Sequence, residues 1–406
     1  MDKLLRRVQS LTPAQRELLR RRLHQQDLRQ IESAAPQAKA PDDFVPQTAR
    51  RKIEFSLFFF SAEGTGNCDE QYNLLIETAL FADRNGFKAV WTPERHFQAF
   101  GGLYPNPSVL SASLAMITQH VQIRAGSLVL PLHSPVRVAE DWALVDNLSH
   151  GRIGISFATG WHEHDYVIAP ENYQDRREVM FRDIEIVRRL WSGETVLLPG
   201  PRGKPTPVKT LPRPIQPILP VWVTVSKPPT WIRAGEIGAN VLTSLITTSL
   251  EDLRQHIASY RQARLENGHD PRSGIVSLML HTYLGADEHL IRERVREPLI
   301  LYLQTYLDQL RPLMNGLADN SSTEMQSLLE FAFERYLQES SLLGTPSKCM
   351  NTIHKLSAAD VDEIACLVDF GLDLETTMES LDLLAELRRS QHSQAPQTEE
   401  QVRRVF

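Results

Sequence analysis

Short apolar runs alternate with amphipathic segments along most of the chain. The apolar runs are rich in Val, Ile, Leu and Phe, as strands buried on both faces are, and we predict strands at residues 53–60, 88–92, 121–130, 153–158, 219–225, 240–245, 275–284 and 363–370. Between them lie segments with helical spacing, among them residues 72–85, 107–119, 136–148 and 176–191. This alternation predicts an α/β protein, and a closed (β/α)8 TIM barrel is the simplest way to bury eight such strands. An open doubly wound sheet is the alternative.

The ends of the chain differ in composition from this main region, which we place at residues 51–386. Residues 1–30 have a helical pattern and carry eight Lys and Arg against three acidic residues, so we predict a basic helical extension. Residues 31–50 are rich in Ala, Pro and Gln and are expected to form a linker. Residues 387–406 are expected to form a polar tail. The stretch 287–343, between the last two strands, is too long for an ordinary connection and predicts a partly helical insertion.

Composition narrows the class of protein further. The chain has 406 residues, 42% of them hydrophobic, and a net charge of −6, which is typical of a globular protein and gives no overall reason to expect nucleic-acid binding. It contains no apolar stretch near the roughly 20 residues of a membrane helix, so we expect no membrane association and a cytoplasmic location. Its cysteines, Cys68, Cys349 and Cys366, include no close pair, which argues against a disulfide framework and a cysteine zinc site.

Candidate functional residues follow four of the predicted strands. They are Glu94-Arg95-His96, Gly126-Ser127, Thr159-Gly160, and Ser226-Lys227 with Thr230. Because the carboxyl ends of parallel barrel strands lie at one end of the barrel, we expect these groups to meet in a single active site.

Each group has a chemical and a structural interpretation. His96 is an acid–base candidate because Glu94 is close enough to bias its protonation, although a histidine here is also suited to a structural hydrogen bond. The small residues Gly126-Ser127 let a flat ligand approach the backbone or allow an unusual peptide geometry, and tight packing is the alternative. Ser226 and Thr230 flank a helix start, where backbone N–H groups favour an anion, and a simple helix cap is the alternative.

A metal site is not predicted. His162 and His164 are two residues apart, whereas two histidines on one helix face are separated by four. A nucleotide-binding glycine-rich motif is also lacking.

Several segments resemble the bacterial luciferase-like, flavin-dependent monooxygenases. The resemblance runs from about Ile53 to Leu384 and rests on Glu94 to Gly101, Leu128 to Pro131, Pro135-Val136-Arg137, Glu140-Asp141, Asp146 to Arg152 and Gly344-Thr345-Pro346. It is closer to the branch found in natural-product gene clusters, for which three segments are typical: Glu94 to Phe97, Tyr104 to Pro107 and Thr159 to His162.

The resemblance implies a barrel that binds reduced FMN, usually delivered by a separate flavin reductase, and reacts it with oxygen. It places a non-proline cis peptide at Gly126-Ser127 against the flavin ring and Thr159-Gly160 beside the flavin. It assigns Ser226 and Thr230 to the phosphate-binding turn. It further implies a homodimer and makes the insertion a lid over the site.

Three positions depart from the luciferase pattern. The first histidine of an adjacent pair is Arg95 here, so His96 stays as the acid–base candidate, while Arg95 is suited to holding an anion. Ala158 replaces a reactive cysteine, and Thr159 replaces a phosphate-binding arginine, which leaves the phosphate more dependent on backbone donors and on Lys227.

The sequence therefore predicts an FMN- and O2-dependent monooxygenase acting on a peptide or polyketide intermediate. The basic N-terminal segment resembles a helical element found before condensation domains of synthases and is suited to docking an acidic carrier protein. Because relatives that use deazaflavin F420 also have a single histidine, an F420-dependent dehydrogenase is the first alternative. A non-catalytic flavin-binding or structural partner of a synthase is the second.

Overall fold

A computed structural model describes residues 52–60, 68–98, 101–246, 248–310 and 322–393. The predicted basic extension and linker lie outside the described residues. The described residues before 320 and after 328 form one compact unit, which contains the barrel. Within the described part of the chain, every helix is too short or too polar to cross a bilayer.

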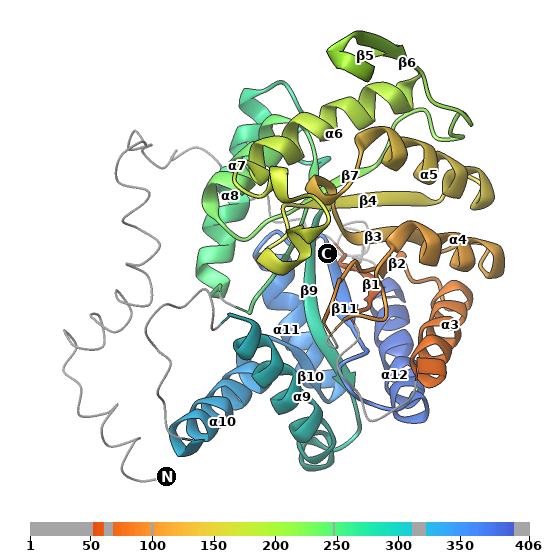
Figure 1. Ribbon diagram of the computed structural model, residues 1–406. Helices are drawn as coiled ribbons and strands as arrows, with labels where there is room; N and C mark the ends of the chain where they lie inside the picture. Colours follow the sequence, from red (N-terminus) through yellow and green to blue (C-terminus); the bar gives the residue numbers. More distant parts are fainter. Residues whose placement is uncertain (1–51, 61–67, 99–100, 247, 311–321, 394–406) are drawn as a thin grey trace. The chain divides into compact units, whose positions relative to one another are not determined.

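Eight parallel strands close into a barrel, as the sequence predicts (Figure 1). Each strand pairs with the next around the ring, and the last pairs with the first. In ring order they are β1 (Glu54–Phe58), β2 (Ala89–Thr92), β3 (Gln122–Val129), β4 (Ile153–Ala158), β7 (Val221–Thr224), β8 (Asn240–Ser244), β9 (Val276–Leu284) and β11 (Glu363–Leu367). Closure rules out the open doubly wound sheet.

Helices surround the strands (Figure 1). They are α3 (Cys68–Arg84), α4 (Pro107–Ile117), α5 (Pro135–Leu148), α6 (Arg176–Ser192), α7 (Pro228–Glu236), α8 (Leu250–Glu266), α11 (Pro346–Ala358) and α12 (Leu374–Ser393). Local chemistry sets several starts. Asn106 caps α4 by accepting hydrogen bonds from the backbone N–H groups of Ser108 and Val109. Thr345 caps α11 in the same way.

The predicted insertion contains two helices and a short strand. These are α9 (Glu288–Leu310), α10 (Ser322–Glu339) and β10 (Leu342–Gly344), which pairs with β9. Two Arg–Glu pairs, Arg292–Glu334 and Arg296–Glu330, join α9 to α10. Its role as a lid stays a prediction.

The structure corrects one boundary and adds one element. Helix α12 continues to Ser393, so the predicted polar tail begins too early; the side chain of Leu387 is 4% exposed and packs in the core. Helix α7 begins at Pro228, between Ser226 and Thr230, where the sequence predicts a helix start. The proline-rich stretch before β7 contains an unpredicted antiparallel hairpin, β5 (Val196–Pro199) and β6 (Pro205–Val208).

A buried ion pair fills the amino-terminal half of the barrel. Arg124 of β3 donates to both carboxylate oxygens of Glu363 on β11, at 3.0 and 2.8 Å, and its guanidinium lies 4.8 Å from the Trp91 ring and 4.3 Å from the Trp222 ring. Ser56 donates to Glu363 at 2.5 Å and accepts from Trp91 Nε1 at 2.8 Å. Side chains from five strands thus close this half of the barrel axis, which leaves the carboxyl half for function.

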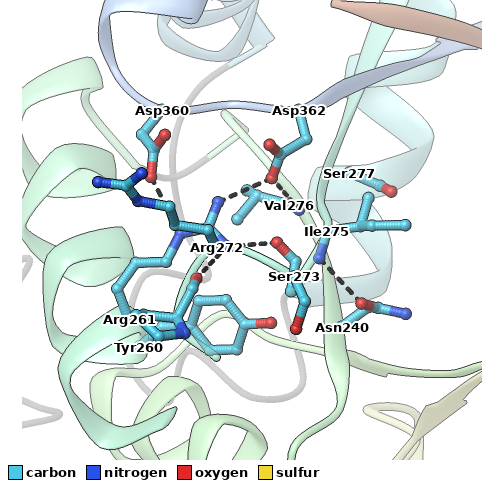
Figure 2. Close-up of polar contacts among 12 residues, drawn as sticks. Asn240, Tyr260, Arg261, Arg272, Ser273, Ile275, Val276, Ser277, Asp360 and Asp362 are labelled. Carbon is cyan, nitrogen blue, oxygen red and sulfur yellow. Dashed lines mark hydrogen bonds and ion pairs between the residues drawn. The ribbon is translucent and has the colours of Figure 1, made fainter. Parts of the chain in front are cut away.

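A second polar network fixes the amino-terminal ends of the strands. Figure 2 shows Arg261 of α8 between Asp360 and Asp362, which accept its hydrogen bonds at 2.9 and 2.8 Å. Asp362 also accepts the backbone N–H of Val276 at 2.8 Å, and so ties α8, β9 and β11 together. Asn240 ties the start of β8 to that of β9, because its side chain accepts the backbone N–H of Ile275.

Candidate active site at the carboxyl end of the barrel

All four predicted groups lie at the carboxyl ends of barrel strands, and contacts through neighbouring residues join the ends of β2, β3, β4 and β7. Glu94, after β2, accepts the backbone N–H of Val129 at the end of β3 at 2.7 Å. The hydroxyl group of Ser127 on β3 contacts that of Thr224 on β7. Gly160, after β4, has φ +65° and lies so close to Val129 that a Cβ would fall 2.8 Å from its Cγ1. The topology therefore brings these strand ends to one end of the barrel, and the roles of the predicted residues there stay predictions.

Glu94 is the buried centre of this site. Its carboxylate has no solvent exposure, and its Oε1 lies 2.9 Å from His96 Nε2 and 2.6 Å from His133 Nε2. With the N–H of Val129, three groups bind one carboxylate. Glu94 therefore orients both imidazole rings, because a buried carboxylate holds its hydrogen-bond donors in place.

The charges in this cluster follow from its geometry. Burial pushes the pKa of Glu94 upward, but hydrogen bonds from His133, His96 and Val129 outweigh it and leave the pKa below its ordinary value. For His133, burial lowers the pKa, but the hydrogen bond and charge of Glu94 raise it more, so the pKa is above its ordinary value. The geometry favours an anionic Glu94 paired with a protonated His133.

The stability of this pair is expected to depend on pH. Because the folded protein raises the pKa of His133 above 6.5, the pair stabilises the fold fully below that pH and loses this contribution as pH rises through the raised pKa. In urea unfolding, the stability difference between the wild type and His133→Gln should shrink by about 1 kcal/mol between pH 6 and pH 9. His289→Gln, whose side chain is 77% exposed, is the control. A difference that stays constant over this range would contradict the assigned charges.

Arg95 faces a second acidic group. Its Nη1 lies 3.7 Å from Asp165 Oδ2, and its guanidinium lies 4.5 Å from the ring centre of Trp161. Burial raises the pKa of Asp165, with the positive charge of Arg95 acting in the opposite direction, and burial together with Arg95 lowers the pKa of His162. His162 Nδ1 and Asp165 Oδ1 lie 3.5 Å apart, and both are buried atoms without a hydrogen bond.

Gly126-Ser127 lies where the barrel axis becomes accessible. Their peptide bond is cis, and a Cβ on Gly126 would lie 2.8 Å from Phe58 Cε2. From Ser127 toward the carboxyl ends of the strands, inward-facing residues of five strands are partly exposed: Ser127, Ala158, Thr224, Ser244 and Met279. The carboxyl half of the axis is thus polar on one side and open to solvent.

The phosphate site predicted at α7 has different donors from those expected. Pro228 and Pro229 form the first turn and have no N–H, and the N–H groups of Thr230 and Trp231 both bind the carbonyl of Lys227. Ser226 and Lys227 are exposed, and Thr230 is buried. This helix start therefore offers an anion side-chain donors in place of the first-turn N–H groups, and phosphate binding by Ser226, Lys227 and Thr230 stays a prediction.

Two elements of the site were missed in the sequence. His133 follows the short helix Leu130–Leu132, and only this turn brings it back to Glu94. The sequence signal that could have identified His133 is its position as a titratable residue soon after the end of a strand. No pattern in the sequence marks Asp165 and Tyr166, which lie in the helical turn Glu163–Val167. Tyr166 donates to the carbonyl of Thr159 at 2.5 Å and so holds the end of β4.

A closed parallel barrel with a buried acid–base cluster at the carboxyl ends of its strands has the architecture of a (β/α)8 barrel enzyme. A family model described as luciferase-like monooxygenase matches residues 53–363. The chain belongs to the luciferase-like monooxygenase family.

Three known proteins illustrate this relationship. The oxygenase component of a flavin-dependent trigonelline monooxygenase from Acinetobacter baylyi is 25% identical over 342 residues, covering 81% of this chain and 93% of that protein. The oxygenating constituent of 3,6-diketocamphane monooxygenase from Pseudomonas putida, solved with FMN, has a TM-score of 0.68 at 19% identity and covers 84% of this chain and 98% of its own. An F420-dependent secondary alcohol dehydrogenase has a TM-score of 0.62 at 17% identity, with coverages of 83% and 98%.

Proposed function

We propose that this protein is a monooxygenase that uses reduced FMN and O2. The observation that carries the proposal is the Glu94-centred cluster, which lies beside the accessible carboxyl half of the barrel axis. Glu94 has no exposure and binds His96 at 2.9 Å, so an acid–base group is held at the edge of a partly open, polar-lined site. Family membership and the flavin-dependent relatives support the choice of cofactor.

The residues present fit a flavin. Gly126, Ser127, Thr159 and Gly160 are small residues where the axis opens, so they leave room for a flat ring. The side chains of the exposed residues Ser226 and Lys227, together with that of Thr230, would hold the phosphate. The positive charge of Lys227 would compensate for the N–H donors that this helix start lacks. When bound, reduced flavin supplies the electrons that activate dioxygen.

The chain's own residues provide binding, orientation and proton transfer. Glu94 fixes the ring of His96 through Nε2, which leaves Nδ1 to exchange a proton with a bound ligand. His133 balances the Glu94 charge, so the carboxylate keeps its role without taking up that proton. Arg95 is buried beside Asp165 and is suited to holding an anionic oxygen.

Cofactor binding separates this proposal from the F420 alternative. The purified protein should bind FMN more tightly than F420 in a fluorescence titration, and Lys227→Ala should weaken FMN binding by about tenfold because one cation–phosphate contact is lost. Lys209→Ala is the control, because Lys209 is an exposed lysine in the proline-rich stretch before β7. Tighter binding of F420 would favour the dehydrogenase, which the shared fold of an F420-dependent enzyme keeps as the second candidate.

The proposed substrate is a peptide or polyketide intermediate of natural-product biosynthesis, attached to a carrier protein. Two observations support this substrate. Three segments, residues 94–97, 104–107 and 159–162, resemble the natural-product branch of the family, and residues 1–30 have a basic composition. A flavin reductase as electron source and a homodimer complete the proposal. Deletion of residues 1–45 should reduce turnover of carrier-bound substrate and spare turnover of the free substrate. Equal effects on both would contradict carrier docking.

A further inference from the structure

His281 is a buried histidine whose ring nitrogens have no hydrogen bond. It lies on β9 with 0% exposure, and both Nδ1 and Nε2 are without a partner. The acid–base cluster described above does not use it. A buried polar group without a partner is costly, so an apolar residue would be more stable here.

The ring of His281 faces the barrel axis. Ser277, on the same strand, accepts a hydrogen bond from Trp222 inside the barrel, and side chains two residues apart on a strand share a face. Met279 and His281 therefore face inward as well. Met279 is partly exposed, so the accessible part of the axis reaches the level directly beneath His281.

Three aromatic rings enclose the imidazole from the other sides. Their centres lie 4.3 Å (Tyr302), 5.1 Å (Tyr336) and 5.4 Å (Phe370) from that of His281, all in edge-to-face geometry. Burial lowers the pKa of His281 to about 3, so the ring is neutral and has one donor and one acceptor nitrogen. A neutral imidazole inside an aromatic wall is suited to one uncharged hydroxyl group.

Tyr302 contacts His281 and also lies near Arg95 of the candidate active site. Its ring also contacts that of Phe60, after β1, at 6.3 Å, and its hydroxyl influences the pKa of Arg95. Pro298 lies one turn earlier inside α9 and interrupts the hydrogen bonding of this helix. The Arg–Glu pairs that join α9 to α10 are partly exposed, and such pairs contribute little. Pro298 therefore marks the point of α9 at which Tyr302 can shift, while Leu299 and Leu303 on the same helix stay buried.

We propose that His281 is a specificity-determining residue: a planar, largely apolar substrate with one hydroxyl group displaces Tyr302 and takes the His281 imidazole as its hydrogen-bond partner. This proposal rests on the monooxygenase function, because it assigns a substrate class to the same site. The hydrogen bond would recover the cost of the unpartnered ring and would select against molecules that lack the hydroxyl.

Two probes of the same shape test the proposal by calorimetry on the full-length protein without flavin. p-Cresol should bind at least about tenfold more tightly than p-xylene, since only p-cresol offers a hydroxyl group. His281→Phe keeps the ring and removes its polar atoms, so it should abolish this preference and raise the urea midpoint of unfolding. Tyr302→Ala keeps the imidazole and removes the ring to be displaced, so it should tighten p-cresol binding about threefold or more.

His256→Phe is the matched control. His256, on α8, also has a buried nitrogen without a partner, but its ring stacks on Trp231 outside the barrel, so the preference should not change. No preference for p-cresol in the wild type, or the same preference in His281→Phe, would overturn the proposal. Failure to bind FMN in a separate titration would count against the monooxygenase function and leave this result unaffected.

Discussion

Glu94→Gln is expected to reduce product formation by about 100-fold or more, the usual scale for losing an oriented acid–base group. The substitution keeps the shape of the side chain. However, a glutamine has one acceptor oxygen, whereas Glu94 accepts from His96 and His133 through Oε1 and from the N–H of Val129 through Oε2. In either orientation its NH2 group would face at least one existing donor. The orientation of His96 should therefore be lost.

The measurement is the rate at which a substrate accepted by the wild type gains one oxygen, with FMN affinity determined in parallel. FMN affinity should change less than threefold, because Glu94 is not among the residues proposed to hold the cofactor. Glu163→Gln, an exposed carboxylate in the nearby helical turn, is the control and should keep wild-type activity. A Glu94→Gln protein within threefold of the wild-type rate would remove Glu94 from the mechanism.

Removal of one partner of the Arg124–Glu363 pair is expected to produce the largest loss of stability, about 3–5 kcal/mol. The two side chains are 1% and 2% exposed, so either substitution leaves a charge inside the barrel without its counter-ion. Arg124→Met and Glu363→Leu should each lower the free energy of unfolding by this amount in urea titrations at pH 7.

The double substitution distinguishes the cost of an unpaired charge from the value of the pair itself. Arg124→Met combined with Glu363→Leu removes both charges, so it should be more stable than either single variant. The two single losses of unfolding free energy could each be below about 1 kcal/mol, or they could simply add in the double variant. Either result would show that Arg124 and Glu363 do not act as a coupled buried ion pair.

The barrel was predictable because its strands are buried on both faces. This burial demands continuous apolar runs, and runs such as Ile153 to Ala158 stand out against their flanks. The hairpin β5–β6 was not predictable in this way. Pro199, Pro205 and Pro207 lie within it, and Leu197 is 67% exposed, so neither propensity nor alternation marks it as sheet.

The candidate site also has a part that was predictable from the sequence and a part that was not. Residues directly after strands could be placed together because parallel strands end at one side of a barrel. The contacts that give Glu94 its character depend on the fold of a short turn, which returns His133 to a residue 39 positions earlier. Similarly, the sequence shows that Pro228 and Pro229 favour a helix start and lack N–H groups, but only the structure shows that the N–H groups of Thr230 and Trp231 after them bind the carbonyl of Lys227.

The function that we propose for this site is oxygen insertion driven by reduced FMN and O2. Its most direct test combines the purified protein, a flavin reductase, FMN and candidate pathway intermediates under 18O2, with products analysed by mass spectrometry. We predict a product that gains one 18O atom only when FMN, the reductase and the protein are all present. Oxidation or reduction of a substrate with F420 alone, without incorporation of 18O and without a response to reduced FMN, would contradict the claim.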